Sequence, residues 1–429
     1  MSATEARKGT ILTVGLSPEP AVYSLQQIKP DFAAFICTRE SATTLDKVWE
    51  VISLPQSHVW QREIEDAPDQ IGRLVHEFYN AFLWLRDDCK VQPQQIQIDP
   101  TLGRKWMSAG VTMIASYLGL SMSYTDVRFK DNKPDPTTMR FIPLGNAYDQ
   151  TGFLEAEKAR ELFNRYEFSA ASEVFERLRP TLSTSADLYA GLAQLARTLH
   201  RWELFEHYDR SLHEDFNRAF NHLDRSAYSG AVPHGFAEFL AETRRLADAV
   251  EEVTIARKPC LIATVDLLLN AERRVNQGRY DDATARSYRA LESMSQLYLA
   301  TRFHLATSNP DYRQLTQAQR EAIVAQGLSQ PAKIALEEGW RLLWALRDES
   351  AQEVMEQRKD GKLYNKFQGV LDDRNNSILA HGWNPVGGER ARRMVGRLKD
   401  VLVKAEGDPA RGLMARLEPP ALPSFWGAN

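Results

Sequence analysis

Arg374 and His381 have the residue types and the spacing best suited to chemistry on a phosphate. They lie seven residues apart in the stretch LDDRNNSILAHGW, Leu371 to Trp383. An arginine holds a phosphate by charge, and a histidine exchanges protons near neutral pH. If the stretch is helical, seven residues make about two turns, so both side chains face the same way. The pattern therefore predicts either a phosphate-handling site or, as for most such stripes, a solvated helix face.

A second candidate site, for an anionic ligand, lies in two loops that follow predicted strands. One loop is GLSPEPAVY, after the strand Gly9 to Gly15, and the other is DPTLGRKWMS, Asp99 to Ser108. In the second loop Thr101 offers a hydroxyl, and Gly103 lets the backbone come close to a ligand. The next helix presents unpaired N–H groups beside Lys105, which suits an anion. The alternative is a tight strand-to-helix turn with a lysine that only reaches solvent.

Neither loop has the sequence of a nucleotide-binding motif of the two commonest kinds. There is no Walker A sequence and no GxGxxG in either of them. An NTPase or a dinucleotide-dependent enzyme is therefore disfavoured.

The elements that must position these loops alternate between strand and helix over the first 150 residues. GTILTVG, DFAAFICT, VWQREI and QIQID read as strands. Helices are expected at AVYSLQQIKP, over residues 69–89 and over about residues 104–118. SMSYTDVRF and MRFIPLG flank the turn DNKPDP as two late strands. This alternation predicts a doubly wound parallel sheet of the Rossmann kind with a late hairpin at its edge. Ligands bind outside the carboxyl ends of such strands, where both loops lie.

Strand signals stop near residue 151, and apolar residues then recur at helical spacing. Residues 151–254 read as paired helices that loosely resemble tetratricopeptide repeats but lack a fixed period. Further helices follow from residue 260 onward, with Gly278 as an interruption. We therefore expect an α/β domain over 1–150, a helical connector over 151–254 and a helical domain over 255–429.

Composition and charge exclude several classes of protein. The 429 residues include 53 Lys and Arg against 57 Asp and Glu, a net charge of −4. A protein that mainly grips duplex nucleic acid is usually basic, so DNA is not an expected partner. No apolar signal core and no run of 18 apolar residues are present, so no contact with a membrane is expected.

Cysteine and histidine usage argues against a metal site. Three cysteines lie far apart without a CxxC pair, which excludes a zinc ribbon and favours a reducing, cytoplasmic setting. The four histidines of the middle segment lack the spacing of three or four that helical metal ligands need. They are therefore expected to be surface or packing residues: His200, His207, His213 and His222.

The second loop resembles a turn of the CARF domains of CRISPR-associated effectors. IDPTLGRKWMSAGV is similar to their D-x-T-G-G-T-K-x-M-S/A pattern, which lies beneath a bound cyclic oligoadenylate. The sequence departs from it at Leu102 and Arg104, where the family often has Gly and Thr. The positions that match are Asp99, Thr101, Gly103, Lys105 and Met107.

The loop TVGLSPEP also resembles the first-strand loop of CARF domains. The resemblance implies that a cyclic oligoadenylate is an allosteric activator, with cyclic tetraadenylate favoured over cyclic hexaadenylate. The residues that it implies for activator binding are Gly15, Leu16, Ser17, Thr101, Gly103, Arg104, Lys105 and Met107.

The stretch RNNSILAHG resembles the R-x(4–6)-H signature of HEPN ribonucleases, with six intervening residues. Residues Asn270 to Gln296 resemble the paired helices that open the HEPN region in one CRISPR-associated family. The order of sensor first and helical nuclease last is that of type III CRISPR ancillary ribonucleases. The resemblance implies a metal-independent endoribonuclease of antiviral defence that cuts single-stranded RNA to 2′,3′-cyclic phosphate products and needs no cofactor.

The residues of this stretch fit that chemistry. Metal-free RNA cleavage needs a base for the 2′-hydroxyl, a cation for the extra phosphate charge and an acid for the leaving oxygen. His381 can act as base or acid, Arg374 can hold the phosphate, and Asn375 can orient either group. One chain supplies one such pair, and HEPN copies share a cleft across a two-fold axis. A homodimer is therefore implied, with a ring ligand on the same axis.

Two other interpretations compete with a ribonuclease. One is a ligand-responsive, non-enzymatic scaffold or regulator in which the HEPN helices only dimerise, although Arg374 and His381 are both intact. The other is a tetratricopeptide-like interaction protein, although strand signals are confined to the first 150 residues.

Overall fold

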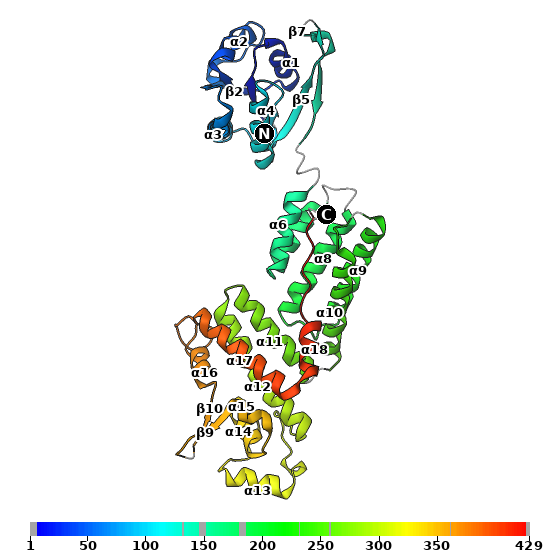
Figure 1. The fold of residues 1–429 in the computed structure, drawn as a ribbon, viewed down its shortest axis with the longest axis vertical. Helices are drawn as coiled ribbons and strands as arrows, with labels where there is room; N and C mark the ends of the chain where they lie inside the picture. Colours follow the sequence, from blue (N-terminus) through cyan, green and yellow to red (C-terminus); the bar gives the residue numbers. More distant parts are fainter. Residues whose placement is uncertain are drawn as a thin grey trace, which may run out of the picture. The chain divides into compact units, whose positions relative to one another are not determined.

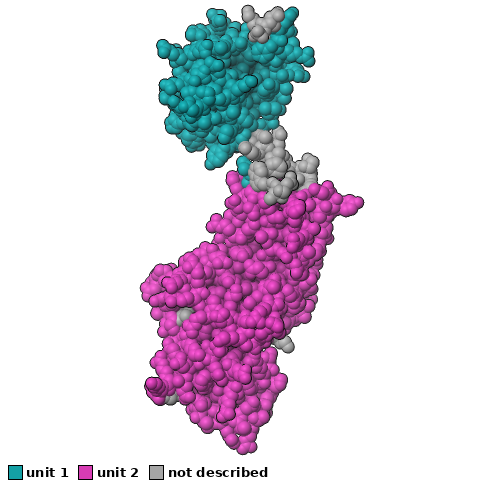
Figure 2. Space-filling view, in the orientation of Figure 1, with its two compact units in different colours: residues 1–154 teal, residues 155–429 magenta. Residues whose placement is uncertain are grey.

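The computed structural model of the chain divides into two compact units. They comprise residues Met1–Leu154 and Glu155–Asn429 (Figure 2). The residues that the structure describes are 7–130, 133–145, 152–179, 186–230, 232–256, 259–360 and 362–425.

The first unit is built on a sheet with the strand order β3-β2-β1-β4-β5-β8 (Figure 1). Neighbouring strands pair in parallel, except that β5 and β8 are antiparallel. The predicted doubly wound sheet with an edge hairpin is therefore confirmed. The strands are β1 Gly9–Val14, β2 Phe32–Thr38, β3 Val59–Ile64, β4 Ile96–Asp99, β5 Ser121–Asp126 and β8 Arg140–Pro143, with the short pair β6 Phe129–Lys130 and β7 Lys133–Pro134 beside them.

Helices cover both faces of this sheet because its central strands are buried on both sides. Ile11 and Ile36 pack with α3 and α4, whereas Leu12 and Phe35 pack with α1 and α2. Successive side chains of a strand point to opposite faces, so one apolar run fills two cores. The helices are α1 Pro18–Ile28, α2 Arg39–Trp49, α3 Ile71–Leu83 and α4 Lys105–Tyr117.

Two helical segments of this unit differ from the sequence-based expectation. Helix α2 lies outside the predicted helices, and its start is fixed by a capping box between Thr38 and Ser41. The single helix expected over 69–89 is instead α3 followed by a π-helical turn over Trp84–Asp88. That turn places Leu85 in the core.

The second unit is mostly helical, as predicted. Its described helices include none that is long and apolar enough to cross a membrane. The helices are α6 Phe153–Asn164, α7 Phe168–Leu178, α8 Ala186–Glu203, α9 Ser211–Ser229, α10 Phe236–Ala256, α11 Leu261–Asn276, α12 Tyr280–Arg302, α13 Gln317–Ala325, α14 Leu336–Ala345, α15 Glu349–Val354, α16 Gln368–Asn375, α17 Gly388–Glu406 and α18 Asp408–Arg416, with a hairpin of β9 Met355–Gln357 and β10 Leu363–Asn365.

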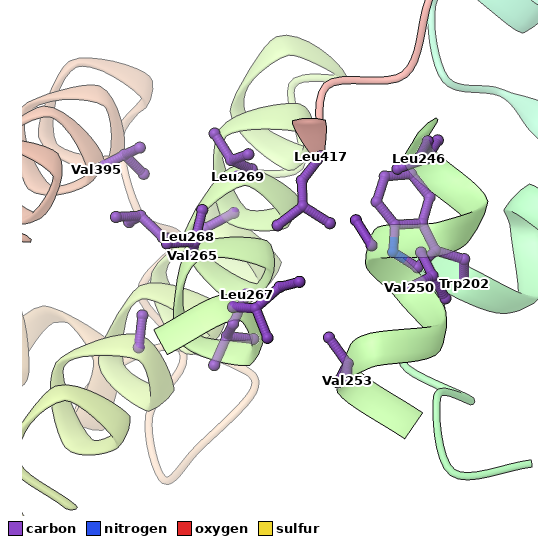
Figure 3. Close-up of a cluster of buried hydrophobic side chains, with 14 of the residues drawn as sticks. Trp202, Leu246, Val250, Val253, Val265, Leu267, Leu268, Leu269, Val395 and Leu417 are labelled. Atoms are coloured by element: carbon purple, nitrogen blue, oxygen red, sulfur yellow. The ribbon is translucent and has the colours of Figure 1, made fainter. Parts of the chain in front are cut away.

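One hydrophobic core runs through the whole second unit, across the division expected near residue 254. Figure 3 shows part of it, where α11 with Leu268 lies between α17, which carries Val395, and α10, which carries Val250. Leu417, after α18, reaches the same core. The C-terminal segment also packs back on the first helices, since Asn164 and Leu422 exchange two hydrogen bonds.

Helix α11 is buried on nearly all sides, and it carries charges into that core. Asp266, Arg273 and Arg274 are each at most 5% exposed. Arg273 and Arg274 both pair with Glu203 at the end of α8, the second at 2.8 Å. The Arg273 guanidinium also lies 4.2 Å from the ring centre of Trp202. The two halves of the helical unit are therefore joined by a buried ion cluster.

Asp266 is the other carboxylate of this cluster, and its hydrogen-bond partners come from α8 and the turn that follows α8. Asp266 accepts a hydrogen bond of 2.8 Å from the indole of Trp202 and contacts the imidazole of His207. His207 is 1% exposed, in agreement with its prediction as a packing residue. Burial lowers the pKa of Arg274, and the Glu203 carboxylate opposes that shift.

We predict that Arg273→Met strongly destabilises the protein. Removal of one partner leaves the Glu203 carboxylate buried with less compensation, which typically costs about 3–5 kcal/mol. Denaturant unfolding followed by helical circular dichroism measures the loss. As a control, Arg245→Met removes an exposed partner of Glu242 and should cost about 1 kcal/mol or less. Equal stability of Arg273→Met and wild type would contradict the role given to the cluster.

Candidate functional sites

The two predicted ligand loops meet at the carboxyl edge of the sheet. They follow the adjacent parallel strands β1 and β4. A Cβ atom on Gly15 would lie 3.2 Å from the backbone nitrogen of Gly103, so the two backbones approach more closely than side chains allow. Gly103 also has a φ of +95°, a conformation that favours glycine. The Thr13 hydroxyl donates to the Leu102 carbonyl and fixes the turn from below.

Asp99 is the residue that holds these loops together. It is fully buried and accepts hydrogen bonds from the Ser24 hydroxyl at 2.8 Å and from the Thr125 hydroxyl at 2.6 Å. The Thr101 N–H donates to its other oxygen at 2.9 Å. One carboxylate therefore ties α1, β5 and the loop after β4 to one point, in agreement with a buried charge needing several donors.

Lys105 is the exposed cation at the start of α4. It has no carboxylate within 4 Å among the residues that the structure describes. Its neighbour Arg104 caps the helix without a side-chain cap bond and pairs with Asp66 at 2.6 Å and with Glu40 at 3.1 Å. Lys105 and the first turn of α4 therefore supply a free charge and free N–H groups at this edge.

Several residues predicted to bind an activator have other tasks in the structure. The Thr101 hydroxyl accepts a hydrogen bond from the Thr125 N–H at 2.9 Å. The Met107 side chain is fully buried in the core beneath α4. Leu16 is 60% exposed, and Ser17 begins α1 without a side-chain cap bond. These two remain available on the first loop.

A hollow of about 670 Å³ opens at the same edge, beyond β2 and β3. Its lining combines carboxylates and arginines and includes Glu40 and Asp66, the two partners of Arg104. The indole of Trp106 donates to Asp66 at 3.0 Å and continues this polar wall.

The stretch with Arg374 and His381 is not one continuous helix, contrary to the sequence-based expectation. Helix α16 ends at Asn375, and residues 376–381 form turns. Ser377 ends the helical ladder, since both its N–H and its hydroxyl bond to the Arg374 carbonyl, at 3.1 and 2.8 Å. Side chains such as Asn and Ser compete with helical hydrogen bonds in this way. The two residues are therefore not two turns apart on one helix face.

A compact turn instead brings His381 back to the end of α16. The His381 N–H donates to the Asn375 carbonyl at 3.2 Å, and the Asn384 N–H donates to the Asn376 carbonyl at 3.1 Å. Gly382 makes this possible, because a Cβ atom there would lie 1.9 Å from the Asn376 carbonyl oxygen. The turn thus collects Arg374, Asn375 and His381 at the carboxyl end of α16.

The polar side chains of this turn are held open to solvent. His381 and Asn375 are exposed, and Arg374 is half-buried. The Arg374 guanidinium lies 4.7 Å from the ring centre of Tyr288 on α12 and donates to the Asn375 side chain at 3.0 Å. Tyr288 was not predicted, although it lies within the segment Asn270 to Gln296. The arrangement presents a cation, an amide and an imidazole on one exposed turn.

Exposed apolar side chains surround this turn. Trp383 is 87% exposed, Ile378 62% and Leu379 56%. Buried residues on either side anchor the segment, since Phe367 and Leu371 pack into the core and the Val386 N–H donates to Asp281 at 3.2 Å. Three large apolar side chains around a polar site are typical of a surface that another molecule covers.

The described residues contain no group of three or more His, Cys, Asp or Glu side chains arranged to hold a metal ion. Among the histidines of the middle segment, His222 contacts the Asp187 carboxylate at 2.7 Å. Hydrogen bonds from Arg225 and His222 lower the pKa of the Asp187 carboxyl to about 2. His207 belongs to the buried cluster described above.

Family comparisons match two segments of the helical unit. Residues 252–405 match the model of the Csm6 HEPN domain, and residues 152–226 match that of the Csm6 6H domain. The two matched segments together span more than half of the chain. The middle segment, which the sequence shows only as paired helices, thus matches a Csm6 domain that is distinct from the HEPN domain. A search of the curated proteins found no match.

Among solved structures, that of Enterococcus italicus Csm6 bound to cyclic hexa-2′-fluoro-hexa-dAMP is similar with a TM-score of 0.52 and 11% identity. The match covers 96% of this chain and 100% of that chain. At this identity it shows the fold alone. Can2 from Sulfobacillus thermosulfidooxidans in complex with cyclic tetra-adenylate matches 39% of this chain and 52% of that chain at 10% identity. Its TM-score of 0.23 is too low to indicate a shared fold.

We predict that Gly382→Ala opens the turn that carries His381. The added methyl group cannot fit against the Asn376 carbonyl, so the amides of His381 and Asn384 should lose their protection against hydrogen exchange. Exchange measured by mass spectrometry on peptides over residues 376–384 reports this change.

The control is Gly396→Ala in α17, where a Cβ atom meets nothing within 4 Å. That change should keep the protection of the turn and stabilise the helix by about 0.5–1 kcal/mol. Unchanged exchange in Gly382→Ala would show that the close approach is not needed.

Proposed function

Because the chain belongs to the Csm6 kind of CRISPR type III ancillary ribonuclease, we propose that it is an endoribonuclease of antiviral defence that a cyclic oligoadenylate activates. The single observation that carries the proposal is the turn at the end of α16, which holds Arg374, Asn375 and His381 together on an exposed surface. The substrate is single-stranded RNA, and the setting is the cytoplasm. We retain the divisions at about residues 150 and 254 as part of the proposal.

The proposed reaction uses the neighbouring 2′-hydroxyl of the RNA as the nucleophile. The new bond joins the 2′-oxygen to phosphorus, the bond from phosphorus to the 5′-oxygen breaks, and a 2′,3′-cyclic phosphate and a 5′-hydroxyl result. One imidazole accepts the 2′-proton, and a protonated imidazole supplies the proton for the leaving oxygen. Arg374 binds the extra negative charge, and Asn375 orients the phosphate. No metal takes part.

We propose that a second copy of the chain completes the site. One chain carries one His381, whereas the reaction needs both a proton acceptor and a proton donor. The exposed Ile378, Leu379 and Trp383 beside His381 support this, since a second copy seated there would bury them. A closed two-fold dimer brings both turns to one cleft.

The activator in this proposal binds at the carboxyl edge of the sheet. Lys105 and the first turn of α4 supply charge and N–H donors, and Leu16 and Ser17 border them on the loop after β1. Gly15 and Gly103 keep the floor low enough for a ring to approach. Arg104 would contribute only if it left Asp66 and Glu40. Cyclic tetraadenylate is the preferred ring in the proposal, with cyclic hexaadenylate as the competitor to test.

We predict that His381→Ala or Arg374→Ala lowers the rate of RNA cleavage by about 10²-fold or more, as loss of one proton-transfer or charge-stabilising group commonly does. Cleavage of a fluorescent single-stranded RNA by activated protein measures the rate, in buffer with EDTA as well as without. His234→Ala, an exposed histidine of the connector, is the control and should cut as the wild type does. Full activity of His381→Ala, or complete loss of wild-type activity in EDTA, would refute this chemistry.

We predict that a doubly inactive chain, Arg374→Ala with His381→Ala, inhibits the wild type when the two are co-expressed. In a shared site each mixed dimer loses half of its groups, so the rate per wild-type chain should fall. Light scattering should give about twice 48.8 kDa without ligand. An unchanged rate per wild-type chain would show that each copy works alone.

We predict that Lys105→Glu abolishes stimulation by either ring and leaves the unstimulated rate intact. A ligand shifts an equilibrium only through its differential affinity for two states, and the added charge should repel each phosphate of the ring. Activator titrations with both ring sizes measure this. The control is Lys47→Glu in the last turn of α2, which is exposed and makes the same change of charge. Equal stimulation of Lys105→Glu and wild type would remove the ring from this edge.

A further inference from the structure

Arginines stacked on aromatic rings fall into two groups in the described part of this chain. In the first group a carboxylate or a backbone carbonyl oxygen also binds the guanidinium. These are Arg7, Arg62, Arg86, Arg244, Arg273, Arg286 and Arg302. In the second group neither a carboxylate nor a backbone carbonyl oxygen of a described residue binds the guanidinium, and Arg374 alone donates to a side-chain amide, that of Asn375. These are Arg358, Arg374, Arg392 and Arg397, and all of them belong to the segment that matches the HEPN model.

Two members of the second group lie at the two ends of α16. Arg397 of α17 lies 4.7 Å from the ring centre of Phe367, the residue just before α16. At the other end of the helix Arg374 lies over Tyr288. Arg390 of α17 pairs with Asp373 there at 2.7 Å, so α17 contacts both ends of α16. Arg392 points to another side of α17, with its guanidinium 5.9 Å from the ring centre of Tyr280.

The hairpin β9–β10 extends the row beyond α16, and Figure 1 shows it directly beside that helix. Arg358 lies 3.9 Å from the ring centre of Tyr364, which is only three residues before Phe367. Lys359 and Lys362 are exposed at the same end of the hairpin. The hairpin Met355–Asn365 thus carries three cations against the two carboxylates Glu356 and Asp360, in a chain whose net charge is −4.

Stacking on a ring and pairing with a carboxylate leave an arginine with different numbers of free N–H donors. A carboxylate neutralises a guanidinium and occupies its donors. A ring face holds the guanidinium flat, keeps its charge and leaves the N–H groups of its edge free. Exposed arginines held in this way are arranged for an anion from outside, and a phosphate matches their fork. Three such positions along the hairpin and α16, at Arg358, Arg397 and Arg374, match a polyanion better than a single small anion.

We propose that Arg358 and Arg397 form a phosphate track that carries single-stranded RNA along α16 to the turn with Arg374 and His381. This inference rests on the proposed function and names the surface that binds its substrate. The track determines how tightly a long RNA binds and takes no part in bond breaking. Basic side chains interleaved with aromatic rings are typical of surfaces that bind single strands without sequence preference.

The test measures binding separately from cleavage. A fluorescent, fully 2′-O-methylated RNA cannot react, so anisotropy at several salt concentrations gives its affinity for the full chain. Arg358→Gln with Arg397→Gln should weaken binding about tenfold, and the slope of log affinity against log salt should fall by roughly 1.4, about 0.7 for each lost contact with a single strand. Lysine at both positions should restore most of the slope.

A kinetic comparison separates the track from the reacting groups. With a long cleavable RNA the double glutamine variant should show a raised KM and an unchanged kcat. A short RNA that covers only the cleavage position should be cut as by wild type. Arg244→Gln is the matched control, since Arg244 is also stacked, on Phe220, but pairs with Asp224 at 2.7 Å.

Each outcome decides one of the two proposals. If wild type cuts RNA and the double variant binds with unchanged affinity and slope, the track is wrong and the ribonuclease stands. An equal loss in Arg244→Gln also overturns the track. If wild type binds RNA through these arginines but cuts none with either ring, the proposed ribonuclease fails and the track remains. No measurable binding of RNA by wild type overturns the track.

Discussion

The helical unit depends on the burial of α11. This helix has neighbours on nearly every side, and it still carries Asp266, Arg273 and Arg274. Charges in such a place must be paired, because an isolated buried charge costs several kcal/mol, on the order of what holds a domain together. Their partners, Glu203 and Trp202, lie at the end of α8. The contacts that compensate the buried charges of α11 therefore also fix the connector helices to the C-terminal helices.

The candidate ribonuclease turn inherits its position from this arrangement. Helix α12 packs along α11, and α16 and α17 pack on α12. Tyr288 of α12 holds the Arg374 guanidinium, and Asp281 at its start anchors the chain beyond the turn. Between these anchors the backbone folds so tightly that only glycine fits at position 382. A rigid scaffold thus carries an exposed, polar turn, which is a usual place for functional residues.

The sheet edge also depends on a buried charged residue that several donors compensate. Asp99 is a fully buried carboxylate whose donors come from α1, β5 and its own loop. Those bonds hold the loops after β1 and β4 in contact, and the contact itself needs Gly15 and Gly103. In both units, then, a buried carboxylate with several donors fixes the framework. At the sheet edge the exposed Lys105 lies outside this hydrogen-bond network and keeps its charge free.

The sequence alone determined the features that depend on local pattern. Consecutive apolar residues such as Ile11 and Leu12 predict a sheet covered on both faces, and helical spacing after residue 151 predicts the helical unit. The motif residues Arg374, His381 and Lys105 are likewise visible as types at a spacing. These features could be predicted because each depends on neighbours within a few positions.

Tertiary structure decided what surrounds those residues. Helix α16 stops at Asn375 because Ser377 takes its last hydrogen bonds and Gly382 packs on Asn376, which the helical period of the stretch does not reveal. Arg104 is neutralised by Glu40 in the first turn of α2 and by Asp66 after β3, and Met107 lies in a core built by distant helices. The stacked arginines around α16 are of this kind too. Ion pairs and ring contacts of this range form only when the folded chain brings distant segments together, so their partners cannot be deduced from local periodicity.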